Sequence, residues 1–511
     1  TCIVSKKGDL IHKIWIEDSN VGNTINSEGI YGFISNIDCK IGGQLIDRHT
    51  NDWNAIWWNL TTEESKVNGL KNCFEYDSGT IDTDSPNNLN QSIYYPLNFW
   101  FCRNIGLALP LIALQYHEVK LEITYGPNGG QNTPKVWIDY IFLDTDERRK
   151  FSQISHEYLI EQVQYDTFPA DKSAYILKFN HPVKELIWVN DVSGNITQGT
   201  SSGPCFAPIR CTEDIAADNS SEPYKNADST SARLVLNGKD RFAKRKMKYF
   251  KTCQVLQHHT RCPAIGEKHL ISISNVCSGN GIPSASDVLY NNSSGSNPVS
   301  GNSMLIYPLF IPMKDIRIRN INLITTGANS SSTNRELIVY RSHKRIEEDN
   351  IISYNSNDKL ITTFTIPNDT TESGLVGRKN VYHGDQNNGS GEARNIPSYR
   401  PIYLKANVDL SASNIPGAPD FNAKIDIEYE ELPLLIGGRS CDNLGNIYCY
   451  SFALKPEEHQ PSGTCNFSKI DSAEIIFNDP VGSVNTKLKV FALNYNVLRI
   501  QSGMAGLAYS N

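Results

Sequence analysis

The stretch GLALPLIALQYHEVKL (residues 106–121) is apolar as far as Leu114 and then becomes polar. It runs into VKLEITY (residues 119–125), where apolar and polar residues alternate. Side chains of a β-strand point alternately to opposite faces, so this alternation predicts a strand with one face on a core. The apolar run contains Pro110 and ends too early for a bilayer-spanning helix, which needs about 20 residues. The stretch therefore indicates a strand of a soluble protein.

The same alternation recurs along the chain, and the loops between are rich in Gly, Asn and Ser. Further strands are predicted at residues 12–17, 136–143, 315–324, 423–430 and 488–500. Only residues 144–159 and 240–257 favour helices. Many strands with few helices predict an all-β protein built from sandwiches of the jelly-roll kind.

Charge and cysteine usage narrow the function. The formal net charge of −7 argues against a general nucleic-acid binder, which needs a basic surface. The twelve cysteines are dispersed without a CxxC pair. Because disulfide frameworks belong mainly to short secreted chains, we expect most of them to be reduced thiols.

Residue pairs that resemble catalytic or metal sites favour structural interpretations. His117 and Glu118 are adjacent in a strand-like stretch and would point to opposite faces, so they cannot act on one substrate together. CQVLQHHTRC (residues 253–262) holds two Cys and two His, which leaves zinc binding open, but its spacing does not match a zinc finger. We predict no catalytic, cofactor-binding or metal-binding residues and no enzymatic activity.

Two glycine-rich or basic motifs also favour structural interpretations. IGGQLID (residues 41–47) lacks the strand–GxGxxG–helix context of a dinucleotide site and indicates a turn or bulge. KRKMK (residues 244–248) is interpreted as the solvated face of a helix rather than a phosphate or localisation patch.

The segment YYPLNFWFCRNIGLALPLIALQYHEVKL (residues 94–121) resembles a hallmark segment of the major capsid proteins of nucleocytoplasmic large DNA viruses, with the algal-virus and giant-virus branches the most similar. Other similar segments follow in the same order along the chain and reach its last residue. They are residues 40–53, 136–164, 178–189, 236–250, 450–471 and 493–511.

The resemblance implies a double jelly roll, in which two eight-stranded sandwiches lie side by side in one chain. Residues 1–145 would form the first jelly roll, without an opening strand that family members have ahead of residues 8–11, and residues preceding Thr1 would be missing. Residues 146–157 would be a connector, and residues 158–511 the second jelly roll. On this interpretation residues 106–121 are a buried turn leading into a strand.

Residues 264–446 depart from the family pattern, which passes quickly between the flanking segments. Their alternating strands and Gly-rich loops predict a β-rich surface insertion domain within the second jelly roll. Its Asn-X-Ser/Thr sequons at Asn291, Asn292, Asn329 and Asn388 would be the most accessible glycan acceptors if any are used.

The family resemblance further implies homotrimeric, pseudo-hexagonal capsomers in the icosahedral shell of a large double-stranded DNA virus, assembled in the host cytoplasm. The expected partners are identical chains, neighbouring capsomers, and minor capsid and penton proteins, with host-surface contact through the insertion. No cofactor and no direct nucleic-acid contact are expected.

Two alternatives stay open at this point. One is a jelly-roll carbohydrate-binding protein, for which Trp53, Trp57 and Trp58 with Glu63 and Glu64 are the only indication. We favour the interpretation that these tryptophans pack between elements or subunits. The other alternative is a minor capsid subunit of the same fold.

Overall fold

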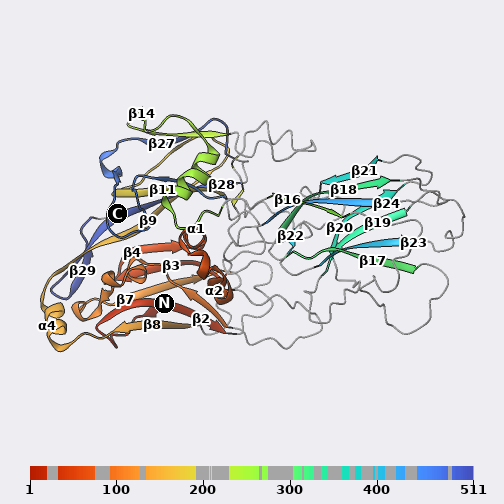
Figure 1. Ribbon diagram of the computed structural model, residues 1–511. Helices are drawn as coiled ribbons and strands as arrows, with labels where there is room; N and C mark the ends of the chain where they lie inside the picture. Colours follow the sequence, from red (N-terminus) through yellow and green to blue (C-terminus); the bar gives the residue numbers. More distant parts are fainter. Residues whose placement is uncertain are drawn as a thin grey trace, which may run out of the picture. The chain divides into compact units, whose positions relative to one another are not determined.

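The computed structural model covers the 511-residue chain (Figure 1). It describes residues 1–19, 33–74, 92–126, 134–191, 206–207, 209, 230–263, 268–273, 303–312, 316–326, 335–342, 359–366, 374–380, 395–396, 401–408, 422–431, 446–481 and 486–509. Two compact units are present. The first comprises Thr1–Ser78, Asp84–Ala264 and Leu435–Asn511, and the second consists mainly of Ile265–Leu434.

The first unit begins with a sandwich of two four-stranded sheets. One sheet has the order β1 (Cys2–Ile3), β7 (Val119–Tyr125), β3 (Ile34–Ile41) and β4 (Gln44–Thr50). The other contains β5 (Ser92–Pro96), β2 (Leu10–Ser19), β6 (Leu109–Pro110) and β8 (Lys135–Ile141). Phe33, just before β3, packs against Tyr95 of β5 with ring centroids 6.4 Å apart, which links the two layers.

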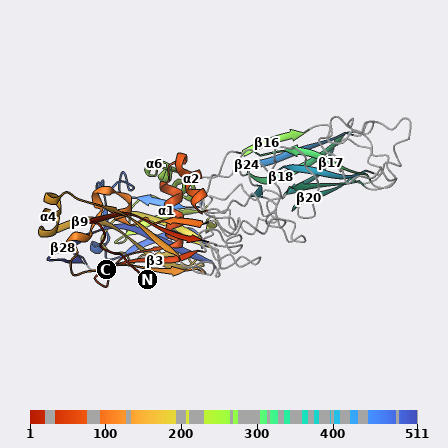
Figure 2. The same cartoon turned by 90° about the horizontal axis from the view of Figure 1, so that it is seen from below.

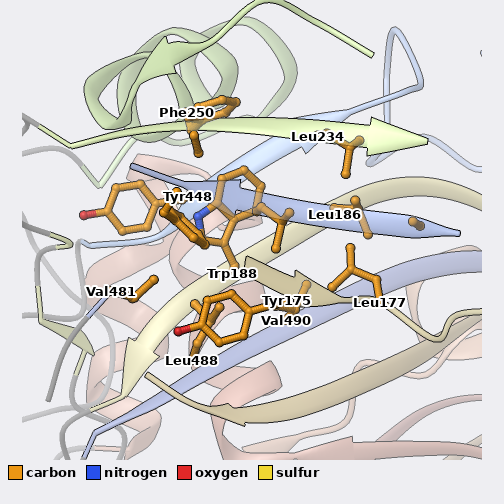
Figure 3. Packing of buried hydrophobic residues seen from close by; sticks show 14 of the residues in the cluster. Tyr175, Leu177, Leu186, Trp188, Leu234, Phe250, Tyr448, Val481, Leu488 and Val490 are labelled. Atoms are coloured by element: carbon orange, nitrogen blue, oxygen red, sulfur yellow. The ribbon is translucent and has the colours of Figure 1, made fainter. Parts of the chain in front are cut away.

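A second sandwich completes this unit. Its seven-stranded sheet contains β12 (Phe206–Ala207), β11 (Pro182–Asp191), β28 (Lys487–Gln501), β29 (Met504–Leu507), β25 (Tyr448–Ser451), β26 (Cys465–Asn466) and β9 (His156–Pro169). Its five-stranded sheet contains β10 (Ala174–Ile176), β27 (Ala473–Phe477), β13 (Ser231–Leu236), β14 (Lys239–Asp240) and β15 (Arg245–Lys246). Figure 3 shows Trp188 of β11 at the centre of their shared core, among Phe250, Tyr448 and Val490.

The second unit is a separate sandwich with its own core (Figure 2). One sheet contains β16 (Lys268–Ile273), β24 (Asn422–Glu431), β18 (Ile316–Thr326), β21 (Gly374–Asn380) and β22 (Asn395–Ile396). The other contains β17 (Ser303–Phe310), β23 (Ile402–Val408), β19 (Arg335–Arg341) and β20 (Lys359–Ile366). Ile321 and Ile427 of the first sheet share a buried cluster with Val339 and Leu404 of the second.

The helices within the described residues are short. They are α1 (Asn51–Thr61), α2 (Glu64–Phe74), α3 (Trp100–Arg103), α4 (Thr145–Gln153) and α6 (Gln254–His258), with 3-10 turns η4 (Ile105–Leu107), η5 (Leu111–Ala113) and η10 (Phe467–Lys469) and the π-helical turn η8 (Tyr249–Cys253). No helix in the described ranges is long and apolar enough to cross a bilayer.

The all-β prediction is confirmed, and each predicted strand is present as β2, β7, β8, β18, β24 or β28. The buried turn is also confirmed, because η4, β6 and η5 lead into β7 with Leu109 and Leu114 buried. The helix predictions were too long. Helix α4 ends at Gln153, and β9 begins at His156. The short strands β14 and β15 lie within residues 239–246, and helical residues begin at Met247. The basic motif at residues 244–248 therefore lies mostly outside the helix.

The predicted core face of the C-terminal strand β28 is wrong. In the sequence, the larger residues Phe491, Leu493, Tyr495 and Val497 alternate with Val490, Ala492, Asn494 and Asn496, which predicts that the first set faces the core. In the structure, Leu488, Val490 and Ala492 belong to the core of the second sandwich. Phe491 instead lies 5.8 Å from Trp53 of α1, measured between ring centroids. Both faces of this strand are buried, so its larger side chains do not mark the core face.

Candidate functional site: the junction between the two sandwiches

Helix α1 joins the two sandwiches of the first unit. Thr50 begins the helix by accepting a hydrogen bond from the Trp53 backbone N–H (3.2 Å), and residues from Asp52 to Leu60 are buried. Trp53 stacks on Trp57 at 5.4 Å and faces Phe491 of β28. The Arg103 guanidinium lies 4.6 Å from the Trp57 ring centroid. In Figure 1, α1 and β4 lie beside β9 and β28. We call these contacts the inter-sandwich junction.

A lysine held between two aspartates crosses the junction. The Lys489 Nζ of β28 lies 2.7 Å from Asp191 Oδ2 and also donates to Asp52 Oδ2 of α1. Burial raises the pKa of Asp52, and Lys489 opposes this only in part. Burial alone would lower the pKa of Lys489, but the two carboxylates outweigh it and raise that pKa. The group is therefore a compensated ion cluster that joins α1, β28 and β11.

A second charged cluster is centred on Glu161 of β9. Its Oε2 lies 2.9 Å from Arg103 Nη1, and its Oε1 accepts from the buried Lys184 Nζ. Lys184 also donates to the Glu458 carbonyl oxygen at 3.1 Å and lies over the Tyr495 ring. Burial lowers the pKa of Lys184, although Glu161 opposes the shift. The cluster joins α3, which carries Arg103, to three strands of the second sandwich, β9, β11 and β28.

Backbone contacts add to the same junction. The Asp47 Oδ1 of β4 accepts from the Val163 N–H at 3.1 Å, and Gln162 Nε2 donates to the Ile46 carbonyl. Asn496 Nδ2 donates to Gln162 Oε1 at 2.9 Å. These hydrogen bonds fix the alignment of β4 against β9, because buried polar groups that lose their partners are costly.

The three tryptophans that indicated a carbohydrate site are buried within the junction. Trp53, Trp57 and Trp58 are each less than 5% exposed, so they cannot stack on a sugar. An open cavity of ≈ 590 Å³ near Glu161 and Glu458 is bordered by Trp100, which is also buried. The structure thus confirms the interpretation that these tryptophans pack between elements.

His117 and Glu118 have structural positions. His117 Nδ1 accepts a hydrogen bond from the Ala505 N–H at 3.1 Å. A Cβ on Gly42, whose φ is +58°, would lie 2.3 Å from the same nitrogen, so the β3–β4 turn needs glycine there. This agrees with the turn predicted for residues 41–47. Glu118 is exposed and pairs with Lys120 at 3.3 Å.

His259, from the motif that resembled a zinc site, is buried at the end of α6. Its Nε2 lies 2.6 Å from Glu185 Oε1 of β11, and its Nδ1 lies 2.8 Å from Glu457 Oε1. Burial alone would lower the pKa of His259, but Glu185, a hydrogen bond with Cys449, and Glu457 together outweigh it and raise the pKa well above its usual 6.5. Burial raises the pKa of the adjacent Cys449 thiol to about 12. Sequence reasoning missed Glu185 and Cys449, because they are distant in sequence and carry no motif.

The glycosylation candidates Asn291, Asn292, Asn329 and Asn388 lie outside the described residues. A further sequon asparagine, Asn59, is fully buried, and its Nδ2 donates to the Ala55 carbonyl at 2.8 Å. The eight described cysteines are free thiols, of which Cys39, Cys102 and Cys449 are buried.

Two antiparallel β-sandwiches joined within one compact unit define the double jelly-roll class. Residues 1–144 match the family described as major capsid protein N-terminus. Residues 147–285 and 433–506 match the large eukaryotic DNA virus major capsid protein family. The chain belongs to this family of major capsid proteins, and its function is to build the viral capsid.

Individual relatives agree with this assignment. The chain is 31% identical over 526 residues to the major capsid protein of Pyramimonas orientalis virus, covering 100% of this chain and 86% of the relative. It is 28% identical over 585 residues to capsid protein 1 of Acanthamoeba polyphaga mimivirus, covering 99% and 90%. Among solved structures, the PBCV-1 virus capsid quasi-atomic model is similar at a TM-score of 0.49 and 22% identity, covering 100% and 92%.

Proposed function

We propose that the chain forms homotrimers, which pack side by side as pseudo-hexagonal capsomers of an icosahedral shell. The observation that supports this is a set of exposed apolar side chains within or just after β8 and α4. Phe142 is 72% exposed, and Trp137 and Ile154 are more than half exposed. Among the described residues, β8 pairs only with β2, so it is an edge strand. Exposed apolar edges favour association unless another chain covers them.

The test is the oligomeric state of the purified chain. Native mass spectrometry should give a mass near three times 57.1 kDa. Phe142→Asp should shift the mass to the monomer, whereas Leu270→Asp should keep the trimer. Leu270 is a matched control because it is 62% exposed but belongs to the second compact unit. A monomeric unsubstituted chain at micromolar concentration would refute the proposal, and a trimeric Phe142→Asp variant would refute the role of Phe142 in the interface.

We further propose that residues 1–145 and 158–511 are the two jelly rolls, with 146–157 as connector and 264–446 as an outward surface insertion. The separate core of the second compact unit supports this division. The insertion would offer the host-contact surface and carry any glycans at Asn291, Asn292, Asn329 or Asn388. Replacing residues 266–445 with a Gly/Ser linker should leave a folded trimer, because loop-closure entropy changes slowly with length. Only aggregated chain from that deletion would contradict it.

The remaining elements of the proposal concern chemistry and location. The chain would be catalytically inert and would assemble in the host cytoplasm with minor capsid and penton proteins. The charged side chains of the inter-sandwich junction pair with one another, which supports the proposal that the chain has no catalytic activity. The net charge of −7 supports the absence of direct nucleic-acid contact. Turnover of any substrate that is abolished by His117→Ala would contradict the inert role.

A further inference from the structure

We propose that Glu185, His259 and Cys449 form a zinc-binding site in the second sandwich. One ligand atom from each residue lies within 4.8 Å of the other two, and all three side chains are buried. The three atoms are a carboxylate oxygen, an imidazole nitrogen and a sulfur.

The sheet places two of the three ligands on one face. Strands β11 and β25 are antiparallel neighbours, with Glu185 opposite Ser451 and Ile187 opposite Cys449. Glu185 and Cys449 are therefore diagonal neighbours on the same face of the sheet. His259 approaches this face from the end of α6, where its backbone N–H donates to the Val255 carbonyl at 2.9 Å.

One of the two carboxylate contacts of His259 matches that of a metal-ligating histidine, and the other, from Nε2 to Glu185 Oε1 at 2.6 Å, is an ion pair that bound zinc would replace. Its Nε2 faces Glu185, while its Nδ1 lies 2.8 Å from Glu457 Oε1. Glu457 is itself held by the Thr260 backbone N–H at 2.9 Å. A histidine that binds zinc usually donates its second ring N–H to a carboxylate, which fixes the orientation of the ring.

Glu185 supplies an independent indication of a ligand. Its side chain is fully buried, and its Oε2 has no hydrogen-bond partner among the described residues. Buried carboxylate oxygens are normally satisfied, because an unpaired polar atom in a low-dielectric interior is costly. A cation bound between Glu185 and Cys449 would satisfy this oxygen.

The donor set selects the metal. Calcium and magnesium prefer oxygen ligands alone, whereas zinc accepts sulfur, nitrogen and oxygen together. Binding would displace the Nε2 proton of the His259 imidazolium and the proton of the Cys449 thiol, and both would pass to solvent. Glu457 would retain the hydrogen bond from Nδ1.

The position of the site suggests what zinc would stabilise. His259 precedes the second compact unit in the sequence, and Cys449 follows it. Both would be tied to Glu185 of the central strand β11. The metal would thus fix the two chain segments that lead into and out of the insertion, where closure of a long loop costs the most entropy.

The experiment uses the full chain as purified. After equilibration with Zn²⁺ and dialysis, elemental analysis should find one zinc per chain, and Co²⁺ should give a thiolate-to-cobalt charge-transfer band. Cys449→Ser should abolish the band. The matched control Cys465→Ser, which removes a half-buried thiol from the same sandwich, should retain it. Glu457→Gln should weaken Co²⁺ binding about 10- to 100-fold, the usual effect of losing a carboxylate that orients a ligand.

Three results would overturn the proposal. The first is no stoichiometric zinc in the unsubstituted chain. The second is a charge-transfer band that persists in Cys449→Ser. If Cys262→Ser removes that band while Cys449→Ser retains it, the sulfur ligand is Cys262 and the proposed site is wrong. The third result applies if the variants do not fold, and it is measured on the unsubstituted chain. Mass spectrometry follows the alkylation of Cys449, which bound Zn²⁺ should slow. An alkylation rate that Zn²⁺ leaves unchanged refutes the site.

Discussion

Replacing Lys489 with methionine should destabilise the first unit strongly. The substitution keeps the aliphatic part of the side chain but removes the cation between Asp52 and Asp191, whose carboxylates are almost fully buried. Breaking a buried ion pair from one side typically costs about 3–5 kcal/mol, because a charge is left uncompensated. Lys489 is 18% exposed, so solvent screens part of this loss and we expect about 3 kcal/mol.

The size of this effect should depend on pH. The pKa of Asp52 is raised above 3.8 in the folded protein by burial, so the folded protein holds that proton more tightly than the unfolded chain does. A raised pKa contributes stability that is present below 3.8 and is lost as the pH rises through the folded pKa. Without Lys489 that pKa rises further. The variant should therefore be closer to the unsubstituted protein at pH 4 than at pH 7.

The assay is urea unfolding followed by the fluorescence of the junction tryptophans, at both pH values. Lys239→Met is the matched control, because Lys239 is an exposed lysine on a strand of the same sandwich, β14, in the other sheet. It should change the free energy of unfolding by no more than about 0.5 kcal/mol. An equal deficit for Lys489→Met at pH 4 and pH 7, or a deficit below about 1 kcal/mol, would refute the assignment of a compensated buried cluster.

Three further predictions concern the second sandwich and the cysteines. Because the pKa of His259 is raised above 6.5, its stabilisation of the metal-free chain should be present below that value and decline as the pH rises through the folded pKa. In the presence of a chelator, the Tm difference between His259→Gln and the unsubstituted chain should shrink at alkaline pH. Reductant should leave the Tm unchanged, because the eight described cysteines are free thiols. A large drop in Tm would contradict this, since losing a disulfide costs about 2–5 kcal/mol. Deleting the chain from Leu488 should abolish soluble expression, since both faces of β28 are buried.

The sequence predicts elements where one face is buried and the other is wet. Strand β7, Val119–Tyr125, was predicted at its observed bounds because its apolar and polar residues alternate clearly. Helix α1 was missed because it is buried on nearly all sides, and a helix enclosed in this way has no polar face to reveal its period. The sequence did not reveal the whole cluster around His259 for another reason. Glu185 and Cys449 are far from His259 in the sequence, and only the pairing of β11 with β25 brings them together beside it.

Strand β28 shows why burial on both sides matters for this fold. Its Leu488 and Val490 fill the core of the second sandwich, while Lys489 and Phe491 contact Asp52 and Trp53 of α1. One strand thus belongs to the second core and to the inter-sandwich junction at once, so the two sandwiches cannot separate without exposing one of its buried faces. Exposing a buried aromatic residue costs roughly 1.5–3 kcal/mol before any ion pair is counted. A capsid subunit must keep its two sandwiches in a fixed arrangement. Strand β28 provides this rigidity because both of its faces are buried, one in the second core and one in the inter-sandwich junction.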